Sequence, residues 1–173
     1  IAGFVAMLGF MNQSMTNSIQ RFINFHMGKG DVDGLLKYFK ASLTAQLLLG
    51  LFIVLVFESF GLWFLNAKMN ISPEKVFDAN VVFQLSCLCL LLNIIKAPYN
   101  AIIIAKEKMD FYAYLSVAEA IIKLFITFSI SWIVTFRLSY YAVMLFVLTM
   151  VVYFLTVVYS KRQMANLNFQ LYF

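Results

Sequence analysis

Charged residues are scarce in this chain. Only 12% of its 173 residues are Asp, Glu, Lys or Arg, against about a quarter in an average soluble domain. The single histidine, His26, lies far from the two cysteines, Cys87 and Cys89, which sit in an apolar run. A metal site needs several such ligands at close spacing. These shortages exclude a metal centre. The sequence also has no hydrolytic triad, phosphate-binding glycine loop or paired-acid motif. We therefore expect the protein not to be an enzyme and to need no cofactor.

Hydrophobic residues make up 63% of the chain, more than one soluble core of this size could bury. The long uncharged stretches are apolar at consecutive positions, as in residues 47–49 and 90–92, so they do not alternate as the strands of a membrane barrel would. A helix needs about 20 residues to cross the hydrocarbon core. The sequence therefore predicts an all-α, polytopic transmembrane helix bundle. Its five expected spanning helices cover residues 1–25, 39–65, 79–104, 111–134 and 138–160.

Both ends of the sequence look internal to a longer chain. It begins at Ile1 inside an apolar stretch and stops at Phe173 in a mixed one. We expect one partial transmembrane domain over residues 1–173, truncated at both ends.

The basic residues predict which side of the membrane each connection faces. Nine of the 13 Lys and Arg residues belong to the first connection, the third connection and the C-terminal tail, whereas three belong to the second and fourth connections. Lys and Arg are enriched in cytoplasmic loops. We therefore expect residues 21–40, residues 106–110 and the tail after residue 160 to be cytoplasmic.

Polar residues recur along the first predicted helix at spacings that place them on one face. They are Asn12, Gln13, Thr16, Asn17, Gln20 and Arg21. A polar face in the membrane should contact protein or water rather than lipid. Amides suit sugar hydroxyls, and a guanidinium group suits a phosphate. The stripe either lines a wet cavity or joins helices to one another.

Charged residues inside the later predicted helices are further candidates. Glu119 and Lys123 have the spacing of neighbours on one helical face, and they either line a cavity or tether two helices. Pro98 should kink or end its helix, and Lys96 or Asn100 could pair with the carbonyls that the kink frees. Alternatively, Lys96 extends its ammonium group to the cytoplasmic interface.

Glu58 is an acid near the outer end of the second predicted helix. It lies either at the membrane interface, beside Trp63, or in a buried position where it could carry a proton. Glu58 and Glu119 are therefore the candidates for binding a coupling ion, H⁺ or Na⁺.

Several short segments resemble one transporter family in order and spacing. Residues 15–22 (MTNSIQRF), followed by residues 28–31 (GKGD), resemble the second transmembrane helix and the next loop of bacterial polysaccharide, or O-antigen, flippases. These are the Wzx-like members of the multidrug/oligosaccharidyl-lipid/polysaccharide (MOP) exporter superfamily. Residues 61–71 and 98–109 are similar to the ends of their third and fourth helices. Residues 111–116 and 138–162 are similar to the fifth and sixth.

The resemblance implies that this chain forms about helices two to six of a transporter with twelve or more, which is most of its amino-terminal lobe. It implies flipping of an undecaprenyl-pyrophosphate-linked oligosaccharide across the bacterial inner membrane, for lipopolysaccharide or capsule biosynthesis. The implied partners are the lipid bilayer, the lipid-linked oligosaccharide, and a polysaccharide polymerase with glycosyltransferases, but no nucleic acid. The candidate residues for the substrate cavity are Asn12, Asn17, Gln20, Arg21, Lys96, Asn100, Glu119 and Lys123.

Two other functions remain open at this point. A MATE-like drug/cation antiporter would need acidic residues in its cavity, and a lysine accompanies Glu119 in this sequence. A membrane scaffold for polysaccharide assembly enzymes would not need the polar face of the first helix.

Overall fold

The computed structural model describes the backbone of residues 2–61, 63, 73–129 and 137–170, and the side chains of residues 13–61, 63, 76–129 and 139–165. Within these ranges the regular elements are all helical, which confirms the all-α prediction. They are α1 (Ala2–Gly28), α2 (Val32–Val56), the π-helix η1 (Phe57–Gly61), α4 (Pro73–Ala105), α5 (Met109–Ser129) and α6 (Arg137–Gln170).

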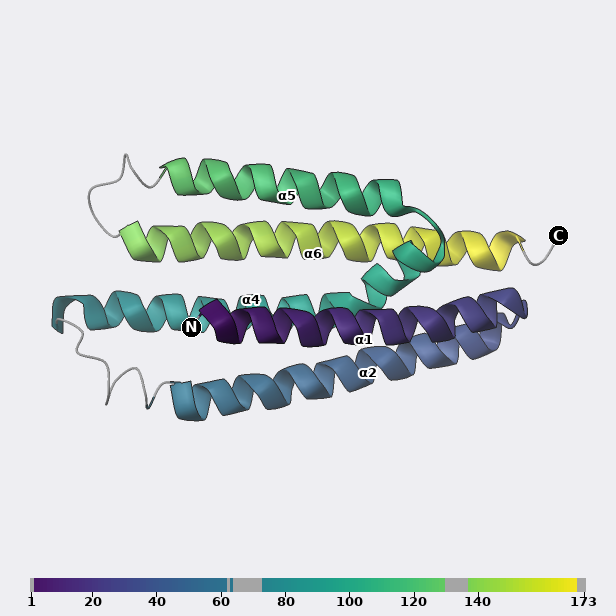
Figure 1. Cartoon of the computed structure of the whole chain (residues 1–173), viewed down its shortest axis with the longest axis horizontal. Coiled ribbons are helices and arrows are strands. Elements are labelled where there is room, and N and C mark those ends of the chain that lie inside the picture. The colour runs from purple at the N-terminus through teal and green to yellow at the C-terminus, as the bar shows by residue number, and fades with distance from the viewer. Residues whose placement is uncertain (1, 62, 64–72, 130–136, 171–173) are drawn as a thin grey trace.

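The helices lie side by side along one long axis (Figure 1). The α1–α2 turn, the α4–α5 turn and the C-terminal end of α6 share one end of the bundle, and these are the segments rich in Lys and Arg. We call it the basic end; that it is cytoplasmic stays a prediction. Four segments are long and apolar enough to cross a membrane: Val32–Gly61, Val76–Ala105, Met109–Ser129 and Ser139–Ala165. The crossing of α1 also stays a prediction.

The helix ends differ from the predicted ones, because local capping and helix propensity extend the helices beyond their apolar parts. Helix α2 begins at Val32 rather than at residue 39, since the side chain of Asp31 caps it by accepting a 2.8 Å hydrogen bond from the Gly34 amide. Helix α4 begins at Pro73, a residue favoured in the first turn. Helix α6 continues to Gln170 rather than ending at residue 160, because its polar continuation holds good helix formers. The predicted end of the fourth span, at residues 130–134, lies outside the described residues.

Pro98 bends α4 without ending it. The helix continues to Ala105, and its C-terminal part turns away from the axis of the rest toward α6 (Figure 1). Pro98 has no amide hydrogen, so the carbonyl of Ile94 loses its helical donor. The helix then ends in a tight turn in which Glu107 takes a left-handed conformation, with φ of 57°.

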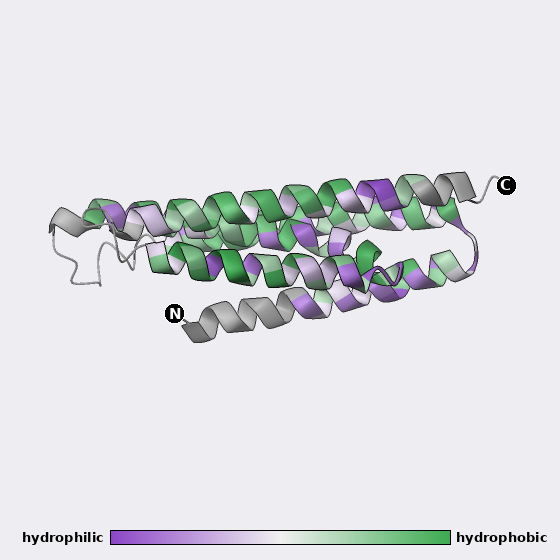
Figure 2. Cartoon of the chain, turned by 90° about the horizontal axis from the view of Figure 1, so that it is seen from above, coloured by the Kyte–Doolittle hydropathy of each residue, from purple (hydrophilic) through white to green (hydrophobic). Residues whose placement is uncertain are grey.

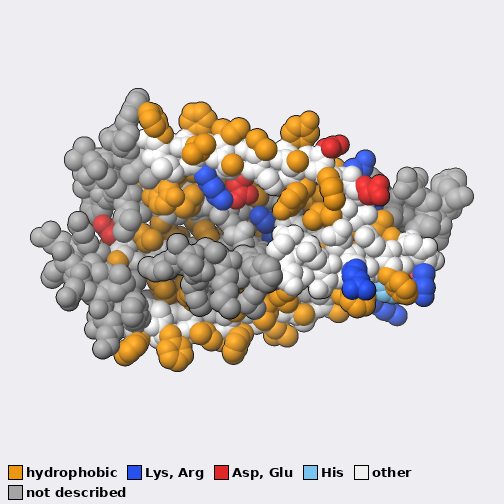
Figure 3. All heavy atoms as spheres, viewed as in Figure 1, with side chains coloured by type: hydrophobic (Ala, Val, Ile, Leu, Met, Phe, Trp, Pro, Cys, Tyr) orange, Lys and Arg blue, Asp and Glu red, His pale blue; other side chains and the backbone are white. Residues whose placement is uncertain are grey.

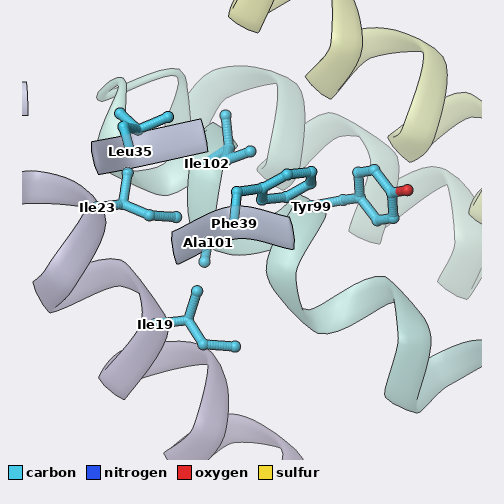
Figure 4. Close-up of a cluster of buried hydrophobic side chains, with 7 residues drawn as sticks. All are labelled: Ile19, Ile23, Leu35, Phe39, Tyr99, Ala101 and Ile102. Carbon is cyan, nitrogen blue, oxygen red and sulfur yellow. The ribbon is translucent and has the colours of Figure 1, made fainter. Parts of the chain in front are cut away.

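The core of the bundle lies toward the basic end, where α1, α2 and α4 meet. It is an apolar cluster drawn in Figure 4, formed by Ile19, Ile23, Leu35, Phe39, Tyr99, Ala101 and Ile102. Phe39 packs edge-on against Tyr99, with ring centroids 5.4 Å apart, and Tyr99 packs in the same way against Tyr153 of α6 at 6.4 Å. These aromatic contacts fix α2, α4 and α6 to one another.

Hydrophobic residues occur along most of the described length of α2, α4, α5 and α6 (Figure 2). Large side chains such as Phe52, Leu124 and Phe154 are 65% to 71% exposed. A soluble protein rarely leaves so many large apolar groups in water. The exposed apolar surface therefore agrees with a chain that lipid solvates.

Candidate functional site

Glu119 and Lys123 form an ion pair midway along α5. Lys123 Nζ lies 2.6 Å from Glu119 Oε1, and the two residues are one helical turn apart. The Glu119 side chain is 24% exposed and that of Lys123 is 49% exposed. Because Glu119 is at the midpoint of an apolar span, both charges lie where an unpaired ion would be costly.

Lys96 of α4 lies within electrostatic range of this pair. The tight turn between Ala105 and Met109 makes α4 and α5 antiparallel, so Lys96 and Glu119 stand at similar heights along the two helices. The charge of Lys96 interacts with both Glu119 and Lys123. We call Lys96, Glu119 and Lys123 the charged triad. It carries two positive charges and one negative charge when all three groups are ionised.

Charged side chains also gather away from the ends of the bundle. Figure 3 shows side chains of both signs near the middle of one face of the molecule. Most other charges on that face lie toward the basic end. Charges at this depth, away from the ends of the helices, indicate a surface that meets water, protein or a polar ligand rather than lipid.

The polar stripe of α1 divides between the core and the surface. Thr16 is buried, Gln20 is half-buried, and Gln13, Asn17 and Arg21 are exposed. Gln13 Nε2 donates a 3.2 Å hydrogen bond to Asn17 Oδ1, so these two amides are ordered along the helix surface. Their exposure argues against a role as glue between the helices described. The side chain of the other stripe candidate, Asn12, lies outside the described residues.

A buried polar group that the sequence patterns did not single out lies on α2, against α1. Gln46 of α2 is only 1% exposed; its Nε2 lies 3.7 Å from Met15 Sδ, and its Oε1 has no hydrogen-bond partner in the described part of the chain. Glutamine carries no charge, so Gln46 does not interrupt the uncharged run of residues 41–57. Only its polarity within that apolar run could have identified it as a candidate. Asn100, the last cavity candidate, is half-buried on α4 beyond Pro98.

Glu58 forms a separate polar contact. It lies in η1 and accepts a 3.0 Å hydrogen bond from Gln84 Nε2 of α4. π-Helical turns are rare and occur often at functional sites. Among the described residues, no hydrogen bond or ion pair joins Glu58 to the charged triad, so the two acids predicted as ion-coupling candidates have different partners: an amide for Glu58 and lysines for Glu119.

The basic end is held together by polar contacts of another kind. Asp31 Oδ2 lies 3.2 Å from His26 Nδ1, which links α1 to the cap of α2. The Gly34 amide first, and then the hydrogen bond with His26, lower the pKa of Asp31 below its ordinary value. Lys106 Nζ donates to the carbonyl of Gln163, and burial lowers the pKa of Lys106. These groups join helix ends, and the part of the chain described has no cluster of His, Cys, Asp and Glu that could hold a metal.

Comparisons with known proteins leave the family open. No protein-family model, no curated protein and no solved structure matches this chain.

Proposed function

We propose that this chain is part of a transporter that flips an undecaprenyl-pyrophosphate-linked oligosaccharide across the bacterial inner membrane, for the synthesis of lipopolysaccharide or capsule. The observation that carries the proposal is the charged triad: two lysines and one glutamate within apolar spans, with Glu119 at the midpoint of its span. A net positive group at this depth is suited to an anionic head group that must leave water.

The two parts of the diphosphate-sugar head group call for different side chains. Lys96 and Lys123 would offer ammonium donors to the phosphate oxygens. The exposed amides of Gln13 and Asn17 on α1 can both donate and accept hydrogen bonds, as sugar hydroxyls require. Arg21 is exposed closer to the basic end, where it would meet a phosphate that arrives from that side. The second lobe that the resemblance implies would close the cavity.

One observation favours a second candidate, a drug/cation antiporter. Glu58 lies in a π-helical turn and is held by the amide of Gln84. A carboxylate fixed in this way could bind a proton or Na⁺. The antiporter reading needs its acid to be free for a cation, whereas Glu119 is held by Lys123. The triad therefore favours the flippase. The scaffold alternative leaves both polar sites without a role.

The test is complementation by the full-length parent protein in a bacterial host that lacks its own flippase. Each variant carries one substitution. The alanine variants are Lys123→Ala, Lys96→Ala and Arg21→Ala, and the charge-preserving variants are Lys123→Arg and Arg21→Lys. Surface polysaccharide is the readout, and membrane insertion is measured in parallel. The matched control is Lys40→Ala, an exposed lysine of the basic end outside the triad.

We expect the alanine variants to insert normally and to lose most surface polysaccharide, while the charge-preserving variants and Lys40→Ala keep it. Failure of the wild-type protein to restore surface polysaccharide would contradict the flippase proposal, and normal export by the Lys96 and Lys123 alanine variants would contradict the role given to the triad. Failure of the wild type, together with drug efflux that is lost on Glu58→Gln, would favour the antiporter.

A further inference from the structure

Exposed aromatic rings gather beside a lysine where α1 meets α2. Phe22 and Phe25 are 52% and 55% exposed, and the ring of Phe22 stacks on that of Tyr38 with centroids 4.8 Å apart. Lys29 Nζ lies 4.2 Å from the centroid of the Phe25 ring. Spacings of three and four residues place Phe22, Phe25 and Lys29 on one face of α1. We call these three side chains, together with Tyr38 of α2, the aromatic–lysine face.

This face lies at one end of a candidate membrane span. The α1–α2 turn is at the basic end of the bundle (Figure 1), and the span Val32–Gly61 begins directly after it. Ile23 is fully buried in the core, so the half-exposed rings of Phe22 and Phe25 belong to another side of α1. Tyrosine is enriched at membrane–water interfaces, and exposed Phe beside basic residues is typical of helices that lie there. The face therefore has the composition of an interfacial anchor.

Lys29 has no acidic partner within the described part of the chain. The residue is exposed, and neither of the ion pairs found among the described side chains includes it. The first 30 residues contain no Asp or Glu, and the next residue, Asp31, is bonded to the Gly34 amide at 2.8 Å and lies 3.2 Å from His26 Nδ1. The ammonium group of Lys29 is therefore available to an anion from outside the chain.

We propose that the aromatic–lysine face binds an anionic phospholipid of the surrounding bilayer. Toward the end of α1 come first Phe22, then Phe25 and then Lys29, which is the order of acyl chain, glycerol and phosphate in a phospholipid. Phe22 and Lys29 are about 10 Å apart along the helix axis, more than the ~5–8 Å thickness of one headgroup layer. With α1 along the membrane normal, the first ring reaches the acyl chains while the ammonium group reaches the phosphate.

The exposed rings favour a phospholipid over an acidic protein in water. An acidic protein would pair with Lys29 but would leave Phe22 uncovered at the level of the hydrocarbon, whereas an acyl chain covers the ring while the phosphate of the same molecule meets the lysine. Binding at this face requires the basic end to lie at a membrane surface. It is independent of the charged triad and of what the protein transports.

The test is photo-cross-linking of lipid to the full-length parent protein in vesicles. Phosphatidylglycerol and phosphatidylcholine carry the same photoactivatable group in the same acyl chain, so the two probes differ only in the head group. The readout is the yield of cross-linked lipid on peptides that cover residues 22–38, at low and at high salt. Lys29→Gln is compared with wild type and with Lys40→Gln, a matched control at an exposed lysine on a different face of α2 from Tyr38. Arg21 stays unchanged because the proposed function already uses it.

We expect wild type at low salt to give about fivefold more cross-linked phosphatidylglycerol than phosphatidylcholine on this segment, the preference of one basic side chain near anionic lipid. The preference should shrink at high salt because salt screens exposed charges. Lys29→Gln should lose most of the preference, while Lys40→Gln should keep it. Equal yields of the two lipids on wild type, or an unchanged preference in Lys29→Gln, would overturn the proposal without touching the flippase assignment.

A second variant, Phe25→Ala, tests the apolar half of the face. The Phe25 ring is 55% exposed, so its removal should leave the fold intact. We expect the yields of both lipids on this segment to fall by a similar factor, because both probes carry the same acyl chain. Unchanged yields of both lipids would show that the rings do not contact acyl chains. That result would favour an acidic protein as the partner of Lys29 and would overturn the phospholipid site.

Discussion

Gly50 of α2 packs directly against Leu91 of α4. A Cβ atom added at Gly50 would lie 2.7 Å from Leu91 Cδ1, so the absence of a side chain lets the two helices approach closely. The neighbouring Ile94 also borders this position. The contact fixes the register between α2 and α4, and this register brings Phe39 onto Tyr99 further along.

Replacement of Gly50 should push α2 and α4 apart, and a larger side chain should do so more. We expect Gly50→Leu to lower the free energy of unfolding of the full-length protein by about 2 kcal/mol or more, because the side chain overpacks the interface. Gly50→Ala should cost much less, since the end of Leu91 can move and alanine favours the helix. Unfolding in detergent measures both. Gly28→Ala, where a Cβ meets nothing within 4 Å, is the control; an equal loss there would show that Gly50 has no special packing role.

Phe39 is the aromatic link between α2 and α4. Phe39→Ala should lower the free energy of unfolding by about 3 kcal/mol, because it leaves a cavity against Tyr99 in the apolar cluster. Phe52→Ala is the matched control on the same helix, since Phe52 is 65% exposed on the lipid-facing surface. Equal losses for the two variants, measured by unfolding in detergent, would contradict the burial difference.

Asp31 should make the α1–α2 turn sensitive to acid. The Gly34 amide and His26 lower the pKa of Asp31, so its ionised form stabilises the fold above its unfolded pKa, and this stabilisation is lost as pH falls through the lower folded value. We expect the protection of amides in the first turn of α2, measured relative to their intrinsic exchange rates, to fall below about pH 4. Asp31→Asn keeps a cap but should remove this pH dependence. Gly34→Ala should accelerate exchange at all pH values, since a Cβ there collides with Asp31 and His26.

Lys106 should hold the α4–α5 turn to the C-terminal part of α6. Its Nζ donates to the Gln163 carbonyl, and nearby Phe111 stacks on Tyr159 with ring centroids 3.7 Å apart. We expect Lys106→Met to increase proteolytic cleavage at the turn severalfold, because the carbonyl loses its donor and the turn opens more often. Lys108→Met, at an exposed lysine two residues away, is the control. Cleavage of both variants at the wild-type rate would show that the bond does not hold the turn.

Several features of this protein follow from local sequence alone. Long apolar runs without alternation determine the helical class, because in lipid a helix satisfies its own backbone hydrogen bonds within one segment. The pairing of Glu119 with Lys123 follows equally directly, since residues one turn apart on a helix are neighbours wherever that helix lies. The common end of the basic segments likewise follows from helices of similar length that alternate in direction.

Other features depend on how the helices pack, and only the tertiary structure decided them. Lys96 is far from Glu119 in sequence and meets it because α4 and α5 fold back at a tight turn. Gln46 is buried and Asn17 exposed, although both are polar residues in long helices, because the rotation of each helix about its axis is set by contacts such as Gly50 with Leu91. Helical periodicity determines which residues share a face of a helix. Whether that face points into the bundle or outward depends on how the side chains pack against the neighbouring helices.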